Sequence, residues 1–184
     1  MEVKEIIQKC LEGDRGAWKM LVDLYSKKIF NLAYQFAGSY QEAEDLTQDI
    51  FLKLFKSLNK YDFDHDFTAW LLTLARNYLI DEFRKNRWEK SQRTELNENI
   101  MSSDDTAHPE AQYLNQEKAA LVWEGLQQLS SELRVTLVLR EIEGLSYEEI
   151  ASKLNLPLGT VKSRVNRGRL QLAQVILEKT GGKL

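Results

Sequence analysis

The stretch Leu145–Ala173, LSYEEIASKLNLPLGTVKSRVNRGRLQLA, decides the fold of the C-terminal part of this chain. Ser146 and Glu149 form an S-x-x-E capping box, which predicts a helix that starts near Tyr147. Asn155 then stands where the chain needs a left-handed turn residue, a conformation that Gly and Asn adopt most readily. The pattern therefore predicts a short helix that ends in a tight turn.

A second helix is expected directly after this turn. Pro157 suits its first turn, because the missing N–H of proline costs nothing there. Residues three and four positions apart share one face of a helix, and apolar side chains repeat at this spacing. The predicted buried stripe consists of Leu158, Val161, Val165, Gly168 and Leu172.

The second helix is basic and has no acidic residue between Gly159 and Ala173. Helix-turn-helix units place such a helix in the DNA major groove, where donors and acceptors read bases and cations hold phosphates. The alternative is a solvated basic surface, although solvated faces usually mix both signs. The face opposite the stripe holds Thr160, Ser163, Asn166 and Arg167, and the flanks hold Lys162, Arg164 and Arg169.

The composition is that of a globular chain, with 184 residues of which 43% are hydrophobic and 29% charged. No apolar run approaches the roughly 20 residues of a membrane span, and the N-terminus has no signal-peptide pattern. Cys10 is the single cysteine, so no internal disulfide can form. We therefore expect a cytoplasmic protein without membrane insertion, in which Cys10 is a small apolar residue or, alternatively, a redox sensor.

The net charge of −3 is unusual for a DNA-binding protein, so its distribution matters more than its sum. Residues 1–94 hold equal numbers of acidic and basic side chains, whereas residues 95–112 hold only acidic ones. Basic residues gather at Arg84–Arg93 and Lys162–Arg169. A free-standing repressor usually needs a stronger basic field, so this distribution favours a subunit that a larger partner delivers to DNA.

The segment 95–112 is the predicted linker between two domains, residues 1–94 and residues 113–184. It lacks helical periodicity and is rich in Ser, Asn, Asp and Thr. Two roles are open for it. It is a solvated tether, or it is an acidic strand that occupies a channel built for nucleic acid.

The N-terminal domain is predicted to consist of helices over residues 3–11, 17–36, 40–58 and 68–88. Gly13 closes the first helix, and Ser39 with Glu42 forms a second capping box at the start of the third. The expected core residues are Leu21, Tyr25, Ile29, Leu32, Phe36, Ala43, Leu46, Ile50, Leu54, Trp70, Leu71, Leu74 and Tyr78.

Two surfaces of this domain stand out. Asp45, Gln48, Asp49 and Leu52 follow the i, i+3, i+4, i+7 spacing of one helix face, which is either solvated or a dock for a basic partner helix. The second is the loop 59–67, which is rich in aromatic residues and precedes an increasingly basic helix. Rings and cations together are typical of single-strand binding, although the same rings can fill a small core.

Three motifs occur in this order: EAEDLTQDIFLKLF (Glu42–Phe55), FTAWLLTLARNYLIDEFRK (Phe67–Lys85) and LREIEGLSYEEIASKLNLPLGTVKSRVNRGR (Leu139–Arg169). Together they resemble bacterial sigma factors of the extracytoplasmic-function (ECF) type. The resemblance covers nearly the whole chain. It implies an all-α fold with a region 2 domain at 1–94, an acidic flexible linker at 95–112, and a region 4 helix-turn-helix domain at 113–184. The acidity of the linker fits a path through the RNA exit channel.

The resemblance also implies a function. Family members are not enzymes and need no cofactor or metal. They bind core RNA polymerase, guide it to promoters and help to open the duplex. The expected partners are the β′ clamp helices, the β flap, promoter DNA and an anti-sigma factor.

Site residues follow from the same resemblance. It places Asp45, Gln48, Asp49 and Leu52 on the clamp helices, and Tyr61, Phe63, Phe67, Asn77, Asp81 and Arg84 at the −10 element. It places Lys162, Ser163, Asn166 and Arg167 at the −35 element, with Thr160, Arg164 and Arg169 beside them. The resemblance does not tell which promoter sequences this chain binds, because Ala69 and Asn166 differ from the residues that many members have at these positions.

Two other function classes are weaker. A two-part regulator, with a ligand or dimerisation domain ahead of a helix-turn-helix, explains Leu145–Ala173 but leaves Asp45–Leu52 and Phe67–Lys85 without a role. A metal enzyme has little support, because His65 and His108 lie far apart and no Cys–His ligand spacing exists.

Overall fold

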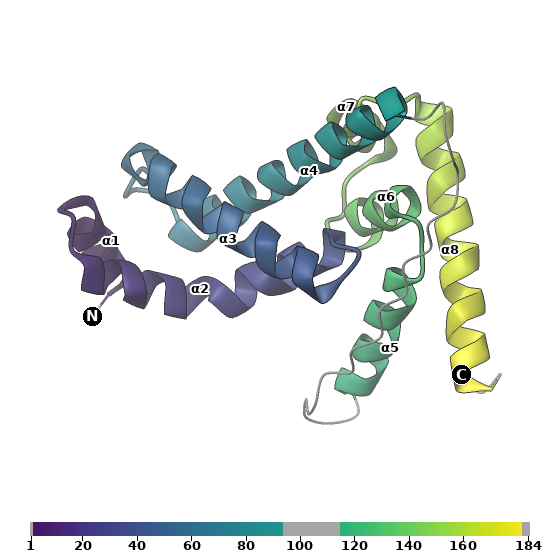
Figure 1. Cartoon of the computed structure of the whole chain (residues 1–184), viewed down its shortest axis with the longest axis horizontal. Helices are drawn as coiled ribbons and strands as arrows, with labels where there is room; N and C mark the ends of the chain where they lie inside the picture. Colours follow the sequence, from purple (N-terminus) through teal and green to yellow (C-terminus); the bar gives the residue numbers. More distant parts are fainter. Residues whose placement is uncertain (1, 94–114, 182–184) are drawn as a thin grey trace. The chain divides into compact units, whose positions relative to one another are not determined.

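The chain folds into helices that form two compact units, Met1–Glu82 and Phe83–Leu184 (Figure 1). The structure is a computed structural model that describes residues 2–93 and 115–181. Every regular element in these ranges is helical, which confirms the predicted all-α class. The first unit contains α1 (Val3–Leu11), α2 (Arg15–Phe36), α3 (Tyr40–Ser57), the short 3₁₀ helix η1 (Leu58–Lys60) and most of α4 (Phe67–Arg93).

The first helices begin and end where their capping residues dictate. α1 has the predicted bounds, and Gly13 after it has a positive φ of 89°. α2 begins earlier than predicted, because Oδ1 of Asp14 accepts hydrogen bonds from the N–H groups of Gly16 (2.7 Å) and Ala17 (3.2 Å). An aspartate in this position satisfies N–H groups that the helix leaves without partners.

α3 and α4 also differ from the prediction in detail. Oγ of Ser39 accepts from the N–H of Glu42 at 3.1 Å, but the Glu42 carboxylate bonds to the N–H of Gly38 at 2.5 Å, so the predicted capping box is not reciprocal. α4 begins at Phe67, where Oδ1 of Asp66 accepts from the N–H of Ala69 at 2.7 Å. It continues beyond the predicted end at residue 88.

The core of the first unit forms where α2 packs along α3. The five residues predicted for α2 are buried, and so are three of the four predicted for α3, Leu46 being half-buried. On α4 the prediction holds for Leu71, which is fully buried, whereas Trp70, Leu74 and Tyr78 are only half-buried. The repeat of apolar residues therefore predicts the burial of α2 and α3 better than that of α4.

The second unit is organised around one long helix. It contains α5 (Asn115–Gln127), α6 (Ser131–Glu141), α7 (Tyr147–Leu154) and α8 (Leu158–Thr180), and α8 packs against the other three. In Figure 1 α8 starts beside α7 and returns along α5. Gly125 permits this close approach, because a Cβ atom there would lie 2.6 Å from Cδ1 of Leu172. An ion pair joins the C-terminal ends of the same two helices, because Nζ of Lys179 on α8 lies 2.6 Å from Oε2 of Glu124 on α5.

The predicted linker, residues 95–112, lies outside the described residues, as does His108. The predicted domain boundaries at residues 94 and 113 therefore stay predictions.

Candidate functional site

The turn between α7 and α8 is built by the residues that the sequence analysis identified. Oγ of Ser146 accepts from the N–H of Glu149 at 3.1 Å, and Oε2 of Glu149 accepts from the N–H of Ser146 at 2.8 Å, which confirms the capping box. These bonds hold the pKa of Glu149 below its usual value. Asn155 ends α7 in the left-handed region, with φ 51°. Pro157, however, is the N-cap of α8 and does not lie in its first turn.

The apolar stripe of α8 is buried in its middle and exposed at its start. Val161, Val165 and Gly168 are buried, whereas Leu158 is 36% exposed and Leu172 is half-buried. Gly168 faces α6, since a Cβ atom there would lie 3.5 Å from the carbonyl oxygen of Leu133. The stripe therefore anchors α8 to α6 at the level of the basic residues.

The opposite face of α8 exposes the polar residues of the predicted −35 surface. Thr160 and Arg164 are half-buried, and burial lowers the pKa of Arg164. Arg169 is exposed, but its guanidinium bonds to Glu141 of α6. The other exposed members of the predicted set are Lys162, Ser163, Asn166 and Arg167.

A second candidate surface lies on α3. Asp45, Gln48, Asp49 and Leu52 are all exposed, Leu52 to 58%. The face continues into a surface groove of about 560 Å³ between α2 and α3. Its lining residues are Arg15, Trp18, Val22, Gln48, Phe51, Leu52 and Phe55.

Sequence reasoning missed the aromatic residues of this groove, two of which lie against each other. Phe55 is 61% exposed, and its ring centroid lies 4.9 Å from that of Trp18. Phe55 could have been found, because it continues the i, i+4, i+7 spacing of Gln48 and Leu52. Trp18 could not, since its pairing with Phe55 depends on how α2 packs against α3.

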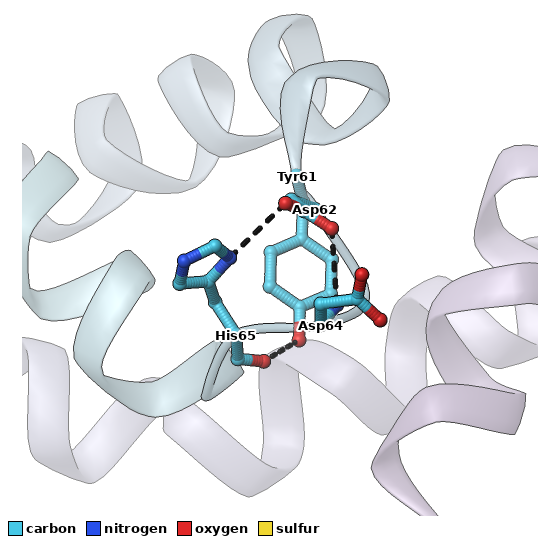
Figure 2. Close-up of polar contacts among 4 residues, drawn as sticks. All are labelled: Tyr61, Asp62, Asp64 and His65. Atoms are coloured by element: carbon cyan, nitrogen blue, oxygen red, sulfur yellow. Dashed lines mark hydrogen bonds and ion pairs between the residues drawn. The ribbon is translucent and has the colours of Figure 1, made fainter.

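The third candidate surface is the loop between η1 and α4 (Figure 2). Oδ1 of Asp62 accepts from the N–H of Asp64 at 3.0 Å, and its Oδ2 lies 3.1 Å from Nδ1 of His65. The Asp64 bond, helped by His65, holds the pKa of Asp62 below its usual value. The Tyr61 hydroxyl donates to the carbonyl oxygen of His65 at 2.5 Å. These bonds all form within the loop and give it a defined shape.

The aromatic rings of this loop differ in their accessibility. Tyr61 and Phe67 were both expected at the −10 element, but both are buried, and their ring centroids are 5.1 Å apart. Tyr61 also packs against Trp70 at 5.3 Å. Phe63 is half-buried and lies 5.2 Å from Tyr61. Of the three predicted rings, only Phe63 offers part of its surface to a ligand, and the other two support the loop from inside.

The predicted polar residues of α4 lie on one face of that helix. Asn77, Asp81 and Arg84 are exposed and follow the i, i+4, i+7 spacing. Tyr78, beside Asn77, donates a hydrogen bond to Asp49 of α3. The helix that carries the predicted −10 residues is therefore bonded to Asp49 of the predicted polymerase set.

Neither a metal cluster nor a membrane helix is found in the described residues. No group of three His, Cys, Asp or Glu side chains in residues 2–93 and 115–181 is arranged to hold a metal ion. Among the helices of the same ranges, none is long and apolar enough to cross a bilayer.

Comparison with known proteins identifies both units. The family model for sigma-70 region 2 matches residues 21–89, and that for sigma-70 region 4 matches residues 119–172. The chain is 35% identical to the RNA polymerase sigma-H factor of Pseudomonas aeruginosa, over 90% of this chain and 89% of that protein. It is 33% identical to the ECF RNA polymerase sigma factor SigW of Bacillus subtilis, over 92% of this chain and 94% of that protein.

A solved structure agrees with these relatives. The sigma factor RpoE from Bartonella quintana, in complex with the anti-sigma factor NepR, matches with a TM-score of 0.52 and 28% identity, over 86% of this chain and 95% of that chain. The likeness extends across both helical units, which a two-part regulator with an unrelated first domain would not give. The chain therefore belongs to the ECF RNA polymerase sigma factors, whose members direct RNA polymerase to promoters.

Proposed function

We propose that this sigma factor uses three separate surfaces: the acidic face of α3 for core RNA polymerase, the 61–67 loop with α4 for the −10 strand, and α8 for the −35 duplex. The observation that carries the proposal is α8 itself. It follows a turn held by Asn155, it is anchored by a buried stripe, and its accessible face holds cations and hydrogen-bonding groups without acidic residues.

The −35 surface divides into base-reading and phosphate-binding positions. Ser163, Asn166 and Arg167 lie opposite the buried stripe and are exposed, so they can reach base edges in a major groove. Lys162 lies toward the flank, where a cation contacts phosphate. The half-buried Thr160 and Arg164 line the other flank and support the binding face from its margin.

The polymerase surface combines charge with an apolar anchor. The carboxylates of Asp45 and Asp49 suit a basic partner helix, and Leu52 with Phe55 offers accessible apolar area beside them. Such a mixture of a hydrophobic centre with a charged rim is typical of specific protein interfaces. It supports docking of the β′ clamp helices on α3. The β flap is the corresponding partner that we propose for the second unit.

The −10 surface has fewer accessible residues than the sequence alone indicated. Phe63, Asn77, Asp81 and Arg84 are accessible and can contact an extruded base and its strand. Tyr61 and Phe67 contribute by packing, because their rings are buried. Losing the stacking of one base costs a few kcal/mol, which a loop of fixed shape helps to offset.

The protein acts without catalysis and without a cofactor, as a transcription initiation factor. It works in the cytoplasm, where bacterial RNA polymerase transcribes. An anti-sigma factor holds it inactive, as the complex of RpoE with NepR supports.

The direct test is reconstitution with core RNA polymerase. The full chain should co-purify with the core enzyme and should make transcription start at DNA sequences selected by the assembled holoenzyme. Asp45→Arg should weaken core binding at unchanged thermal stability. Asp23→Arg is the matched control, because it makes the same charge change at an exposed position of α2 that does not line the groove. A chain that neither binds core enzyme nor changes its start sites is not acting as a sigma factor, and equal core affinity of both variants would remove the α3 face as the dock.

A further inference from the structure

One of the cations predicted to bind the −35 element, Arg169, already forms an ion pair with another residue of this protein. The Arg169 guanidinium donates from Nε at 3.0 Å and from Nη2 at 2.5 Å, both to Oε1 of Glu141 on α6. The two side chains keep 48% and 45% of their surface exposed. This pair therefore sits at the surface of the DNA-binding unit and is not part of its core.

Neighbouring groups reinforce the pair. The hydrogen bond to Glu141 raises the pKa of Arg169 above its usual value, and Tyr147 adds to the effect. Tyr147 also carries Arg140 over its ring, 4.7 Å from the centroid. Arg140 in turn donates to the carbonyl oxygen of Leu145 at 2.8 Å. Glu141 thus belongs to a set of contacts that fixes both arginines at the junction of α6, α7 and α8.

The position of Arg169 on α8 makes this pairing relevant to DNA. Arg169 follows Lys162 by seven residues, which is two helical turns, so the two cations share one flank about 10 Å apart. Lys162 is exposed and has no ion pair among the described residues. A phosphate backbone that runs along this flank would meet Lys162 first and then the Glu141–Arg169 pair.

We propose that Glu141 is a built-in electrostatic restraint on promoter binding, which keeps Arg169 from contacting a DNA phosphate. The inference rests on the proposed role of α8 at the −35 element. A phosphate that binds Arg169 through Nε and Nη2 must displace two charge-assisted hydrogen bonds to Glu141, and one that binds the remaining N–H donors meets the Glu141 carboxylate beside them. The Glu141–Arg169 ion pair therefore stays formed when DNA binds. DNA binding then releases one counterion fewer than the number of basic residues on α8 predicts.

The restraint has a measurable signature in salt dependence. Each phosphate that a protein cation neutralises changes the slope of log K against log salt concentration by about 0.9 for duplex DNA. Glu141→Gln keeps the side-chain shape but removes the negative charge that is paired with Arg169. We expect this variant to bind promoter DNA more tightly at low salt, with a slope about 0.9 steeper than that of the wild-type protein.

The experiment uses holoenzyme assembled from the full chain and core RNA polymerase. The DNA is a promoter fragment selected by the wild-type holoenzyme, and its affinity is measured by fluorescence anisotropy over a series of KCl concentrations. Lys162→Ala calibrates the assay, because loss of an open phosphate contact should make the slope shallower by about 0.9. Glu124→Gln is the matched control, since it breaks the other ion pair of α8, with Lys179, at the far end of the helix.

A second comparison separates the restraint from general repulsion. In an Arg169→Gln background, Glu141→Gln should no longer steepen the slope, because no cation is left to release. A slope for Glu141→Gln that equals or falls below the wild-type slope would overturn the inference, as would the same steepening in the Arg169→Gln background or in Glu124→Gln. Failure of the proposed function looks different, because the wild-type holoenzyme would then select no DNA at all.

Discussion

The Tyr78 hydroxyl on α4 donates a 3.0 Å hydrogen bond to Oδ2 of Asp49 on α3. Burial raises the pKa of Tyr78 well above its usual value, and the bond to Asp49 raises it further. Asp49 therefore serves two surfaces at once. It is exposed on the face proposed for polymerase, and it fastens α3 to the helix proposed for the −10 strand.

Tyr78→Phe should lower the free energy of unfolding by about 1 kcal/mol at neutral pH, the usual net value of a hydrogen bond. Because the folded-state pKa of Tyr78 is raised, its contribution is complete below the unfolded value of about 10 and is lost as the pH rises further. Urea unfolding of both proteins from neutral to alkaline pH measures this. The difference between them should shrink above about pH 10, and a constant difference would exclude Tyr78 as its source.

Arg167→Ala should cost about 1–3 kcal/mol of discrimination at the −35 element, because a bidentate arginine distinguishes one base from the others. Binding of the variant holoenzyme to a set of single-base promoter variants measures the loss. Lys162→Ala is the contrasting change and should weaken binding to all promoter variants alike. An unchanged base preference in Arg167→Ala would assign base reading to another residue.

Asn77→Ala should slow promoter opening more than it weakens the first, closed complex. Asn77 is exposed on α4, the helix that follows the 61–67 loop, so its amide can hold an extruded base. Permanganate footprinting over time reports opening, and gel shift at low temperature reports the closed complex. A variant that is impaired only in the closed complex would contradict this role.

Gly168→Ala should stabilise the second unit by about 0.5–1 kcal/mol, because a glycine inside a helix loses more conformational freedom than alanine does. The new Cβ would lie at ordinary contact distances, 3.5 Å from the carbonyl oxygen of Leu133 and from Cδ2 of Leu137. Gly125→Ala, by comparison, should destabilise, since its Cβ would lie 2.6 Å from Cδ1 of Leu172. Thermal unfolding of the two variants should shift in opposite directions.

Cys10 should react slowly with thiol reagents in the folded protein. It is only 3% exposed, and burial raises its pKa to about 11, with Asp14 adding to the effect. The thiolate is the reactive form, so little of it is present near neutral pH. Colour development with a disulfide reagent should be slow in buffer and fast in concentrated denaturant. An equally fast reaction in buffer and in denaturant would favour the alternative that Cys10 is a redox sensor.

Local signals in the sequence predict local structure well. The Ser146–Glu149 box, the left-handed Asn155 and the bounds of α1 depend on residues a few positions apart, and the structure confirms them. The start of α2 was misplaced because the cap by Asp14 was overlooked, although an aspartate before a helix is a readable signal. Exposure follows from helical periodicity in the same way, which is why the residues predicted for the face of α3, and Ser163, Asn166 and Arg167 on α8, are exposed.

Contacts between distant residues could not be predicted in this way. The pairing of Arg169 with Glu141 and of Trp18 with Phe55 depends on how two helices pack, which no spacing within one helix reveals. Tyr61 and Phe67 are a related case. Aromatic residues in a short polar loop are equally consistent with stacking on bases and with filling a small core, and only the packing against Trp70 decides between them.

The shape of the 61–67 loop has a consequence for the route by which a nucleotide enters it. The loop carries Asp62, Asp64 and Asp66, and all three are exposed. Phosphate groups are repelled from such a place, whereas the face of a neutral base is not. In the proposed −10 role, an unpaired nucleotide must therefore arrive base first, with its sugar–phosphate chain turned outward, so that the aspartates act as a filter for orientation.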